Sequence, residues 1–361
     1  RRKTRGMKIL FITSGVVWIP SGSYKVIYEY ANHLSALGND VTIFYPLYSS
    51  SKNITLDIKS FLTRIKKRFK NERPNWFDLS NKVRTKKVNK VLIKDLDKFN
   101  LIIASNFDVI LALEDALKDF VDLNICQFVH HYEVLTGHDK SKVHQALDFP
   151  SKKIAVSKWT KEYHENLGFN NIHYIPNGID TGKFTITIPN HDREKSILLN
   201  YVDKPIKAID IALKTLEIVC KRFPGIKITL FGPYKKHTKK LPFKYSYFTR
   251  VSEEKLIHLY NTHKVFLSSS KYEGFSFPQI EAMACGCVVV ATDCGGNRDF
   301  TINGINSLIS DAGDYISLAN NLIKVLEDER LAESLSFQAV KTTEKFSWEK
   351  SAQQLLLTIG K

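Results

Sequence analysis

Apolar runs of strand length alternate with helix-periodic segments from the start of the chain. Residues 8–12 form one such run, a loop with Pro and Gly follows, and apolar residues then recur with helical spacing over 26–37. Gly38 ends the helical pattern, and residues 41–44 form the next apolar run. A strand, a helix and a second strand at this spacing predict a parallel βαβ unit.

The same alternation continues along the rest of the chain. Further strands are predicted near residues 101–105, 125–129, 154–156, 172–175, 197–201, 226–231, 264–269 and 287–291. Further helices are predicted near residues 109–118, 158–167, 207–222, 253–262, 278–284, 314–326 and 328–345. Two successive βα arrays predict two doubly wound α/β domains, with a boundary near 176–195 and a linker at 189–195. Because such sheets bind ligands at the carboxyl ends of their strands, the cleft between two of them is the expected site.

Length and composition agree with a two-domain globular protein. The chain has 361 residues, of which 43% are hydrophobic and 25% are charged, and a domain takes roughly 150 residues. No run reaches the roughly 18 apolar residues that a membrane-spanning helix needs. Residues 1–6 are not followed by the apolar run of a signal peptide. Five scattered cysteines indicate a reducing compartment, so we expect a cytoplasmic protein.

The positive charge is concentrated in one segment. The whole chain carries +16, and residues 51–98 alone hold fifteen Lys and Arg against five Asp and Glu. An anionic neighbour of residues 52–98 is therefore expected, such as a membrane surface, a nucleic acid or a polyanionic acceptor.

One part of this segment has the pattern of an interfacial helix. The apolar residues that share one helical face are Ile58, Phe61, Leu62, Ile65 and Phe69, and the basic residues between them include Lys66, Lys67 and Arg68. Trp76 and Phe77 follow, and aromatic residues of this kind sit at headgroup level. We therefore predict peripheral attachment to an anionic membrane, on the inner face of the plasma membrane. The alternative is a helix that packs on the protein core and happens to have a basic outer face.

The densest chemical signal lies between the strand near 264–269 and the helix near 278–284. Glu273 and Glu281 are separated by seven residues, and the turn between them contains Gly274, Phe275 and Ser276. These three residues are expected to present backbone N–H groups at a helix N-terminus, which is a seat for a diphosphate. The alternative is a helix N-terminal acid and an ordinary surface glutamate.

This segment, S-x-x-E-G-F-x-x-x-x-x-E-A-M-A-x-G from Ser270 to Gly286, resembles the signature of the retaining glycosyltransferases of family 4. The likeness continues through residues 287–297, 303–308 and 346–348, and upstream at 156–159 and 175–180. The resemblance implies a GT-B fold, in which two doubly wound Rossmann-like domains face a central cleft. It assigns residues 7–178 to an acceptor-binding domain with the basic insertion, 179–345 to a sugar-nucleotide-binding domain, and 346–361 to a C-terminal helix that packs back on the first domain.

The resemblance also implies roles for single residues. Glu281 is expected to bind the ribose of a nucleotide sugar, Glu273 to hold hydroxyls of the donor sugar, and the backbone of 274–276 to contact the sugar and the diphosphate. Gly22 corresponds to a loop that approaches the diphosphate. The family usually has two glycines there, and this chain has Ser21-Gly22. Ser21 as a simple helix N-cap is the alternative.

Negative charge builds up on the leaving diphosphate, so a basic clamp is required. The family generally uses an Arg and a Lys after the first strand of the second domain. Lys207 fits the Lys position, whereas the Arg position is occupied by another residue type. Lys204 is the candidate replacement, as a point charge instead of a fork. The alternative for Lys207 is a solvated lysine at a helix start.

His130 and His131 stand at the end of the strand near 125–129. The family often has a His there, near the transferring carbon and the acceptor, and a His at a strand end can donate a hydrogen bond to a sugar hydroxyl. We favour His130 and keep His131, because a slip of one residue moves the side chain to the other face. A structural histidine is the alternative.

These inferences predict a retaining hexosyltransferase that moves a hexose from a nucleotide sugar to a membrane-near glycan or lipid-linked acceptor, without a metal or other cofactor. A GT-B sugar-nucleotide epimerase is a second hypothesis. A basic nucleic-acid-binding protein is a third, and the two glutamates of the predicted site oppose it because they would repel a phosphate backbone.

Overall fold

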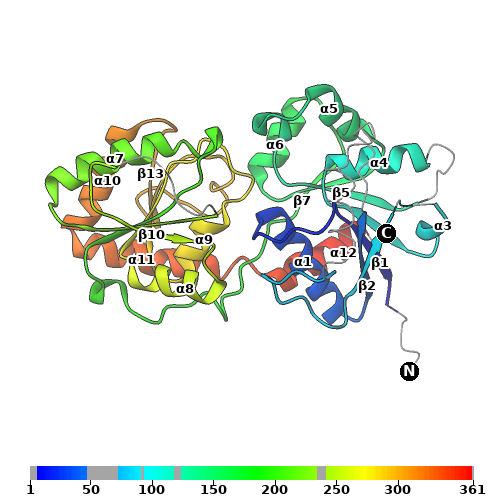
Figure 1. Cartoon of the computed structure of the whole chain (residues 1–361), viewed down its shortest axis with the longest axis horizontal. Helices are drawn as coiled ribbons and strands as arrows, with labels where there is room; N and C mark the ends of the chain where they lie inside the picture. Colours follow the sequence, from blue (N-terminus) through cyan, green and yellow to red (C-terminus); the bar gives the residue numbers. More distant parts are fainter. Residues whose placement is uncertain are drawn as a thin grey trace, which may run out of the picture. The chain divides into compact units, whose positions relative to one another are not determined.

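The computed structural model describes residues 6–46, 72–89, 91, 93–117, 123–233 and 241–359. Its contacts divide the chain into two compact units. Unit 1 consists of Arg1–Val156, Thr160–Asn177 and Trp348–Lys361, and unit 2 consists of Ser157–Trp159 and Gly178–Ser347. Each unit has one sheet with helices on both of its faces (Figure 1).

Unit 1 contains a seven-stranded sheet with the order β3-β2-β1-β4-β5-β6-β7, in which every pair is parallel. Its strands are β1 (Lys8–Ile12), β2 (Asp40–Pro46), β3 (Arg84–Val88), β4 (Leu101–Ala104), β5 (Ile125–Val129), β6 (Lys152–Ala155) and β7 (Ile172–Tyr174). Its helices are α1 (Gly22–Ala36), α3 (Ile93–Leu96), α4 (Phe107–Leu117), the 3-10 helix η1 (Glu133–Thr136), α5 (Lys140–Asp148), α6 (Lys158–Asn166) and α12 (Trp348–Ile359).

Unit 2 contains a six-stranded parallel sheet with the order β10-β9-β8-β11-β12-β13. Its strands are β8 (Ser196–Asn200), β9 (Lys227–Gly232), β10 (Ser246–Thr249), β11 (Val265–Ser268), β12 (Val288–Thr292) and β13 (Ser307–Ser310). Its helices are η2 (Asn190–Asp192), η3 (Pro205–Lys207), α7 (Ile209–Arg222), α8 (Glu253–Thr262), α9 (Phe277–Ala284), α10 (Tyr315–Glu327) and α11 (Glu329–Thr343).

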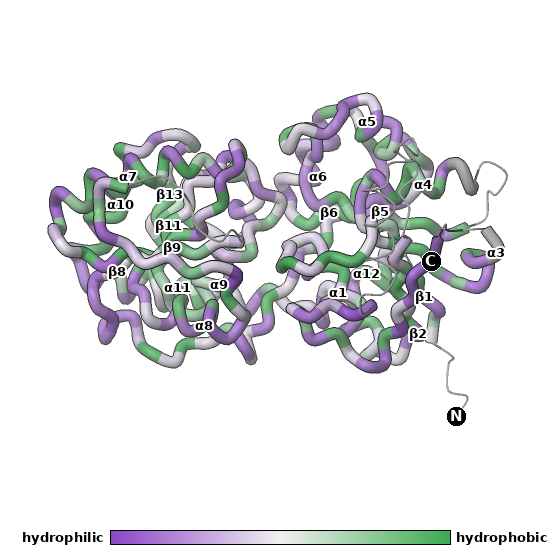
Figure 2. The backbone as a smooth tube through the Cα atoms, viewed as in Figure 1, coloured by the Kyte–Doolittle hydropathy of each residue, from purple (hydrophilic) through white to green (hydrophobic). Residues whose placement is uncertain are grey.

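The hydrophobic pattern explains why the central strands were predictable. β1, β5, β11 and β12 are covered by helices on both faces, so they read as continuous apolar runs, and almost every residue in them is buried. Figure 2 shows the hydrophobic stretches along the strands inside each unit and the hydrophilic stretches on the outer helices and loops. The predicted α/β fold with two doubly wound parallel sheets is confirmed. Within the described residues, no helix is both long and apolar enough to cross a membrane.

The C-terminal helix α12 belongs to unit 1, although the segment before it belongs to unit 2. The ring of Trp348 lies edge-on to Tyr30 of α1, with centroids 5.5 Å apart. At the other end of α12, Asn124 donates to the carbonyl of Ile359 (2.7 Å). Apart from the short segment Ser157–Trp159, the chain therefore passes from unit 1 to unit 2 after Asn177 and back after Ser347, compared with predicted boundaries after 178 and 345.

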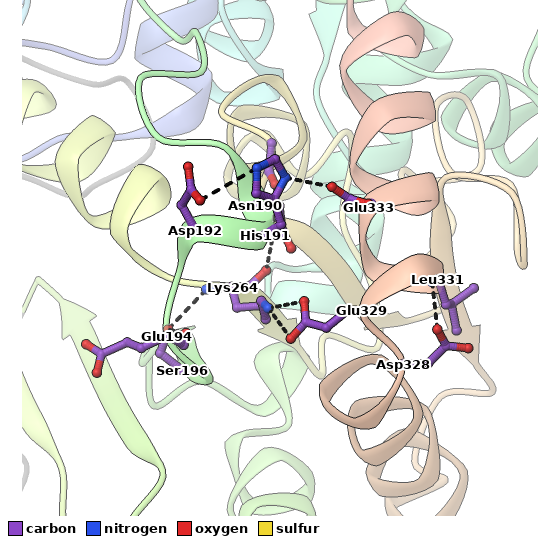
Figure 3. Close-up of polar contacts among 11 residues, drawn as sticks. Asn190, His191, Asp192, Glu194, Ser196, Lys264, Asp328, Glu329, Leu331 and Glu333 are labelled. Atoms are coloured by element: carbon purple, nitrogen blue, oxygen red, sulfur yellow. Dashed lines mark hydrogen bonds and ion pairs between the residues drawn. The ribbon is translucent and has the colours of Figure 1, made fainter.

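The prediction of a linker at 189–195 is wrong. Asn190 and Arg193 are each 4% exposed and pack inside unit 2. The Arg193 guanidinium donates to the backbone carbonyls of Ile188, Tyr260, His263 and Cys285 over 2.6–3.0 Å. Figure 3 shows Asn190 and its neighbours at the amino end of the sheet, near the start of β8. The polar composition that suggested a linker serves instead to satisfy buried carbonyls.

Candidate active site

A pocket opens in unit 2 where the order of the strands reverses. β8 and β11 are neighbours, but the chain leaves them in opposite directions across the sheet, which is where doubly wound sheets bind ligands. The pocket is lined by Leu199, Asn200, Lys207, Phe266, Leu267, Ser268, Ser269, Ser270, Glu273, Ser276 and Pro278. These residues come from β8 and β11, from η3, from the turn after β11 and from the start of α9, which agrees with the strand-end argument.

A lysine and a glutamate meet at this pocket. The Lys207 ammonium donates to Glu273 Oε1, and the Ser270 hydroxyl donates to the same oxygen (2.7 Å). The two charged side chains are 20% and 15% exposed, so the pair is partly shielded from water. Lys207 is therefore not a solvated lysine, and that alternative is wrong. Among the described residues Oε1 is the Glu273 oxygen with hydrogen-bond partners, so Oε2 can accept from another donor, such as a ligand hydroxyl.

The loop that carries Lys207 is tied to the turn that carries Glu273. The Ser269 hydroxyl donates to the carbonyls of Lys207 and Ala208, both at 3.0 Å. The Lys271 amide donates to the carbonyl of Ile206 (2.7 Å). These bonds fix the positions of two segments that are more than sixty residues apart in the sequence. Lys207 and Glu273 are therefore held close to each other by the backbone.

The backbone of the Glu273 turn is fixed from its other side by residues 294–296. The Glu273 amide donates to the Cys294 carbonyl (3.0 Å), and the Gly296 amide donates to the Glu273 carbonyl (3.1 Å). A Cβ added at Gly296 would lie 2.4 Å from the Gly274 carbonyl carbon, so only glycine permits this approach. The Phe275 ring is buried against Phe277 and Phe300, which anchors the turn from below.

The two helices that open at the pocket begin without a side-chain cap. Ser276 precedes α9 with φ +67°, Ala208 precedes α7 with φ +42°, and neither makes a side-chain cap hydrogen bond. Both are non-glycine residues in the left-handed region, a strained conformation that is common at ligand sites. The first N–H groups of a helix lack intrahelical partners and carry partial positive charge. An anion at the start of α9 would therefore meet these dipoles together with the Lys207 ammonium.

Glu281 lies on α9 but outside the pocket lining. Its side chain is 4% exposed, and its Oε2 accepts a hydrogen bond from the Tyr260 hydroxyl (3.2 Å). Burial, reinforced by the Glu281 charge, holds the pKa of Tyr260 well above its ordinary value, so this hydroxyl is a donor at neutral pH. The alternative of an ordinary surface glutamate is wrong. The ribose-binding role remains a prediction, and the sequence pattern did not reveal Tyr260 as its partner.

The remaining donor-site candidates lie at exposed positions. Lys204 is exposed and precedes η3, three residues before Lys207. Gly22 is exposed in unit 1 and is the first residue of α1. Ser21 holds the N-cap position, but its hydroxyl contacts Ser23 Oγ (3.2 Å) and does not cap the helix. The alternative that places Ser21 at an N-cap is therefore confirmed for its position, without a cap hydrogen bond from its side chain, and the roles of Gly22 and Lys204 remain predictions.

In unit 1, the strand order reverses between β1 and β4, and polar residues follow these strands and the adjacent β5. Asn106 donates to Ser14 Oγ (2.7 Å) across the reversal. His130, directly after β5, is 8% exposed and stacks on Phe128 with centroids 5.7 Å apart. Burial, reinforced by the neighbouring His131, lowers the pKa of His130 to about 3, so its ring is neutral at physiological pH.

The two candidate histidines differ in accessibility. His130 Nε2 has no hydrogen-bond partner among the described residues, while His131 is half-buried and lies 3.5 Å from Thr136 Oγ1. A neutral ring whose Nε2 is unprotonated accepts hydrogen bonds, so His130 would accept and not donate through that atom. Their catalytic roles remain predictions.

Glu133 is a buried acid of unit 1 that the sequence argument did not single out. It begins η1, three residues after His130, and is 6% exposed. Burial, with a smaller contribution from Asp108, raises the pKa of Glu133 to about 8, so it is mostly protonated at neutral pH. Its position after a strand end was visible in the sequence, but its burial was not.

The predicted membrane residues Ile58, Phe61, Leu62, Lys66, Lys67, Arg68 and Phe69 lie outside the described residues. Trp76 and Phe77, which follow them, are described. Trp76 donates through its indole N–H to the carbonyl of Val17 (2.9 Å), and both rings pack on Tyr28 with centroids 5.7 and 5.3 Å away. These two aromatic residues therefore pack on α1 of unit 1.

The cysteines and the possible metal ligands of the described residues are considered together. All five cysteines are free thiols, and the reducing environment remains a prediction. Among the described residues, no three His, Cys, Asp or Glu side chains are grouped as metal ligands would be. Metal independence itself remains a prediction.

Two family models match the chain in succession. The model described as Glycosyltransferase Family 4 matches residues 20–183, and the model described as Glycosyl transferases group 1 matches residues 187–342. Together they cover most of both units. The chain belongs to glycosyltransferase family 4. The family assignment made from Glu273, Glu281 and their surroundings is thereby confirmed, and with it the GT-B fold.

Two curated sequence relatives and one solved structure are similar to this chain. Mannosylfructose-phosphate synthase of Agrobacterium fabrum is 27% identical over 52% of this chain and 47% of its own length. The capsular polysaccharide biosynthesis glycosyltransferase CapM of Staphylococcus aureus is 28% identical over 55% of this chain and 56% of its own. The crystal structure of Anabaena HepE with UDP-glucose has a TM-score of 0.74 and 16% identity, and it covers 98% of this chain and 99% of its own. The alignments thus span about half the length of these two sequence relatives.

Proposed function

We propose that this chain is a retaining glycosyltransferase that transfers a hexose from a nucleotide sugar. The observation that carries the proposal is the Lys207–Glu273 pair in a pocket at the strand-order reversal of unit 2. Family 4 membership supports it, as does the structural similarity to HepE, whose crystal structure contains UDP-glucose. CapM, a relative, is named for capsular polysaccharide biosynthesis, which favours a glycan acceptor.

Each part of the pocket has a role in this proposal. The diphosphate lies at the start of α9, where backbone N–H groups and the Lys207 ammonium offset the negative charge that develops as the glycosidic bond breaks. Glu273 accepts hydroxyls of the donor hexose through the oxygen that Lys207 and Ser270 do not occupy. Glu281, oriented by Tyr260, accepts the ribose hydroxyls. Lys204 supplies a second positive charge from the loop before Lys207.

The proposed reaction retains the anomeric configuration without a nucleophile from the enzyme, and the hydrogen bonds of Glu273 support this. Its Oε1 already accepts two hydrogen bonds, one of them from a cation, and both reduce the nucleophilicity of the carboxylate. The acceptor hydroxyl attacks the anomeric carbon from the face that the diphosphate leaves, and a leaving phosphate oxygen takes its proton. The carbon–oxygen bond to the acceptor forms as the bond to the phosphate breaks. The protein supplies positive charge at the phosphate, and no metal ion is required.

The acceptor site falls to unit 1 in this proposal. His130 or His131 contacts an acceptor or donor hydroxyl at the carboxyl end of β5. His130→Ala and His131→Ala, measured separately, identify which one acts, because the loss of a positioned polar group costs at least roughly a hundredfold in turnover. If both variants retain turnover within a few-fold, the acceptor site lies elsewhere.

The donor half of the proposal is tested by a thermal-shift and hydrolysis screen. The protein is incubated with UDP-, GDP- and dTDP-hexoses, and unfolding temperature and free sugar are recorded. One donor should raise the unfolding temperature and be hydrolysed slowly to the sugar with the same anomeric configuration. Stabilisation by no sugar nucleotide refutes the proposal, and release of an epimer without transfer indicates an epimerase.

Attachment of the protein to an anionic membrane is the second part of the proposal. It rests on the six basic residues of the predicted interfacial helix, namely Lys59, Arg64, Lys66, Lys67, Arg68 and Lys70, each contributing about 1 kcal/mol near an anionic leaflet. The protein should sediment with phosphatidylglycerol vesicles and not with neutral ones, and salt should release it. Lys66, Lys67 and Arg68 changed together to Glu should abolish sedimentation and leave donor hydrolysis intact. If this triple variant still sediments, the segment is not the attachment site.

A further inference from the structure

A row of aromatic rings inside unit 1 ends at His130. The Phe128 and His130 rings have planes 9° apart and centroids 5.7 Å apart, so they stack with a sideways offset. Tyr30 of α1 packs on Phe128 with centroids 5.0 Å apart, and Trp348, the first residue of α12, lies edge-on to Tyr30. All four residues belong to unit 1. The row therefore connects the start of α12 to the histidine at the end of β5.

The rings behind His130 are shielded from water. Tyr30 and Phe128 are each 0% exposed, and Trp348 is 3% exposed. Side chains that interdigitate in a dense protein interior keep to well-defined rotamers. The plane of the His130 imidazole is therefore set by Phe128 and, through Phe128, by Tyr30.

The backbone of Ser105 determines which nitrogen of His130 carries the proton. The ring forms a hydrogen bond with this backbone, and Nε2 has no partner among the described residues, so the bond is made by Nδ1. Because the bond acts to raise the pKa of the ring, the Ser105 group is the carbonyl and Nδ1–H is the donor. A bond of this kind fixes the tautomer. Nε2 of the neutral ring is thus left with a lone pair and no proton.

We infer that Phe128 and Tyr30 are positioning residues, which hold His130 so that its Nε2 accepts a hydrogen bond from a substrate hydroxyl. A sugar hydroxyl can donate such a bond, whereas an ionised phosphate oxygen cannot. His131, by comparison, is half-buried and lies 3.5 Å from Thr136 Oγ1, so the row of rings favours His130 of the two candidates. This inference rests on the proposed function, because it takes the carboxyl end of β5 as a place where a substrate hydroxyl binds.

Phe128→Leu tests the stacking contact through turnover. The reaction is the hydrolysis of UDP-, GDP- and dTDP-linked glucose, galactose and mannose, in which water takes the place of the acceptor hydroxyl. We expect kcat to fall about tenfold and KM to stay within about twofold, because a small misplacement of a group at the reacting atoms slows the reaction more than it weakens binding. Tyr30→Leu should lower kcat by about threefold, since it acts through Phe128. Tyr30→Phe keeps the ring and should retain wild-type turnover.

Nuclear magnetic resonance of the imidazole nitrogens measures the state of His130 directly. Histidine is isotope-labelled in the full chain, and the His130 signals are assigned by their loss in His130→Gln. In the wild type, Nε2 should give the signal of an unprotonated nitrogen and Nδ1 that of a protonated one. Phe128→Leu should show a mixture of both tautomers, because the ring is no longer held against Ser105.

Phe44→Leu is the matched control for damage to the core of unit 1. Phe44 is a second buried phenylalanine of the same sheet, in β2, and it packs in a core cluster that includes neither Phe128 nor His130. Its replacement should lower the midpoint of urea unfolding as Phe128→Leu does, and it should leave kcat and the His130 signals as in the wild type.

The outcomes separate the inference from the proposed function. If Nε2 carries the proton in the wild type, or if Phe128→Leu lowers kcat no more than Phe44→Leu does, the inference is overturned while donor hydrolysis still supports the proposed function. If the wild-type protein hydrolyses none of the sugar nucleotides, the proposed function is refuted, and a role of His130 toward a substrate hydroxyl is refuted with it.

Discussion

Unit 2 holds a Lys–Glu pair at each end of its sheet, and the two pairs differ in what surrounds them. At the carboxyl end, Lys207 and Glu273 are 20% and 15% exposed and line a pocket. At the amino end, Lys264 is 2% exposed and donates to Glu329, whose carboxylate is 53% exposed (Figure 3). We call Lys207–Glu273 the open pair, because it lines a pocket, and Lys264–Glu329 the closed pair, because its lysine is buried.

The closed pair belongs to a network in which most donors bond to carbonyls and carboxylates of the protein, while Asn190 Oδ1 has no partner among the described residues. The Asn190 side-chain amide donates to the carbonyls of Lys264 (3.0 Å) and Gly286 (2.9 Å), and the Lys264 backbone amide donates to Ser196 Oγ (3.1 Å). Arg193 satisfies four further carbonyls beside it. Such a network has little capacity left for a ligand. The open pair leaves one carboxylate oxygen and two uncapped helix starts available, and this spare capacity is what marks a binding site.

Glu273→Gln should have the largest effect on activity. It removes the charge that Lys207 and Ser270 hold in place, and turnover of the donor should fall at least roughly a hundredfold. The unfolding free energy should change by less than about 1 kcal/mol, because the remaining Lys207 ammonium reaches water. Initial rates and urea unfolding on the same preparation measure both. A large loss of stability with little loss of turnover would make the carboxyl-end pair structural.

Glu281→Ala is expected to weaken donor binding by roughly 1.5–3 kcal/mol for each lost hydrogen bond to ribose. It also leaves the Tyr260 hydroxyl without its acceptor, so some loss of stability accompanies it. Tyr260→Phe removes that hydroxyl and keeps the carboxylate, so it is the matched control and should retain most of the UDP affinity. Calorimetry with UDP measures both variants. Unchanged affinity in Glu281→Ala would remove Glu281 from the site.

Glu329→Gln makes the same chemical change at the closed end and should have the opposite profile. It leaves the Lys264 ammonium buried with only a neutral partner, which costs about 1–3 kcal/mol of unfolding free energy. Turnover should stay within about twofold of wild type. Glu333→Gln changes a carboxylate that is 52% exposed and pairs with His191, and it should be nearly silent in urea unfolding. Loss of turnover in Glu329→Gln at constant stability would mean that the two ends of the sheet are coupled.

The sequence predicted the buried central strands better than the edge strands and the mainly exposed helices, for physical reasons. A parallel strand buried on both faces is a continuous apolar run, so β11 and the turn after it could be located, and with them Glu273. Edge strands lack this signal: β3 reads Arg-Thr-Lys-Lys-Val, and it was not predicted because four of its five side chains remain partly or fully exposed. The helix α5 was missed because only Val143, Ala146 and Leu147 of its nine residues are buried.

Contacts between residues far apart in the sequence were the second feature that the sequence predicted only in part. Lys207 and Glu273 could each be placed at a strand end, and strand ends of a parallel sheet share one edge, so their meeting was predictable. The buried position of Arg193 was not predictable. Its five side-chain N–H donors bond to backbone carbonyls, and every residue type has a backbone carbonyl. The burial of Glu133 and of Glu281 likewise depends on which neighbours cover them, and residue spacing does not carry that information.

The smallest expected effect is a pH dependence of stability at the closed end. His263 is buried, its Nδ1–H donates to the Leu259 carbonyl (2.8 Å), and its Nε2 accepts from the Thr229 hydroxyl (2.8 Å), so both nitrogens are satisfied in the neutral ring. Burial lowers the pKa of His263 to about 4, below the 6.5 of an unfolded chain. Its contribution to stability is therefore complete above pH 6.5 and is lost as the pH falls through about 4. By pH 5 the loss should be on the order of 1–2 kcal/mol.

Urea unfolding of wild type and His263→Gln at pH 7.5, 6 and 5 isolates this contribution, because all other titrations are shared. The difference in unfolding free energy between the two proteins should shrink steadily toward pH 5. His258→Gln, which removes an exposed histidine from the same helix, controls for the loss of one imidazole. Donor affinity should be unaffected by His263→Gln at pH 7.5, since this ring lies at the end of the sheet remote from Lys207. A constant difference across the three pH values would show that the pKa of His263 is the same in the folded and the unfolded protein. The closed network would then be less isolated from water than its hydrogen bonds indicate.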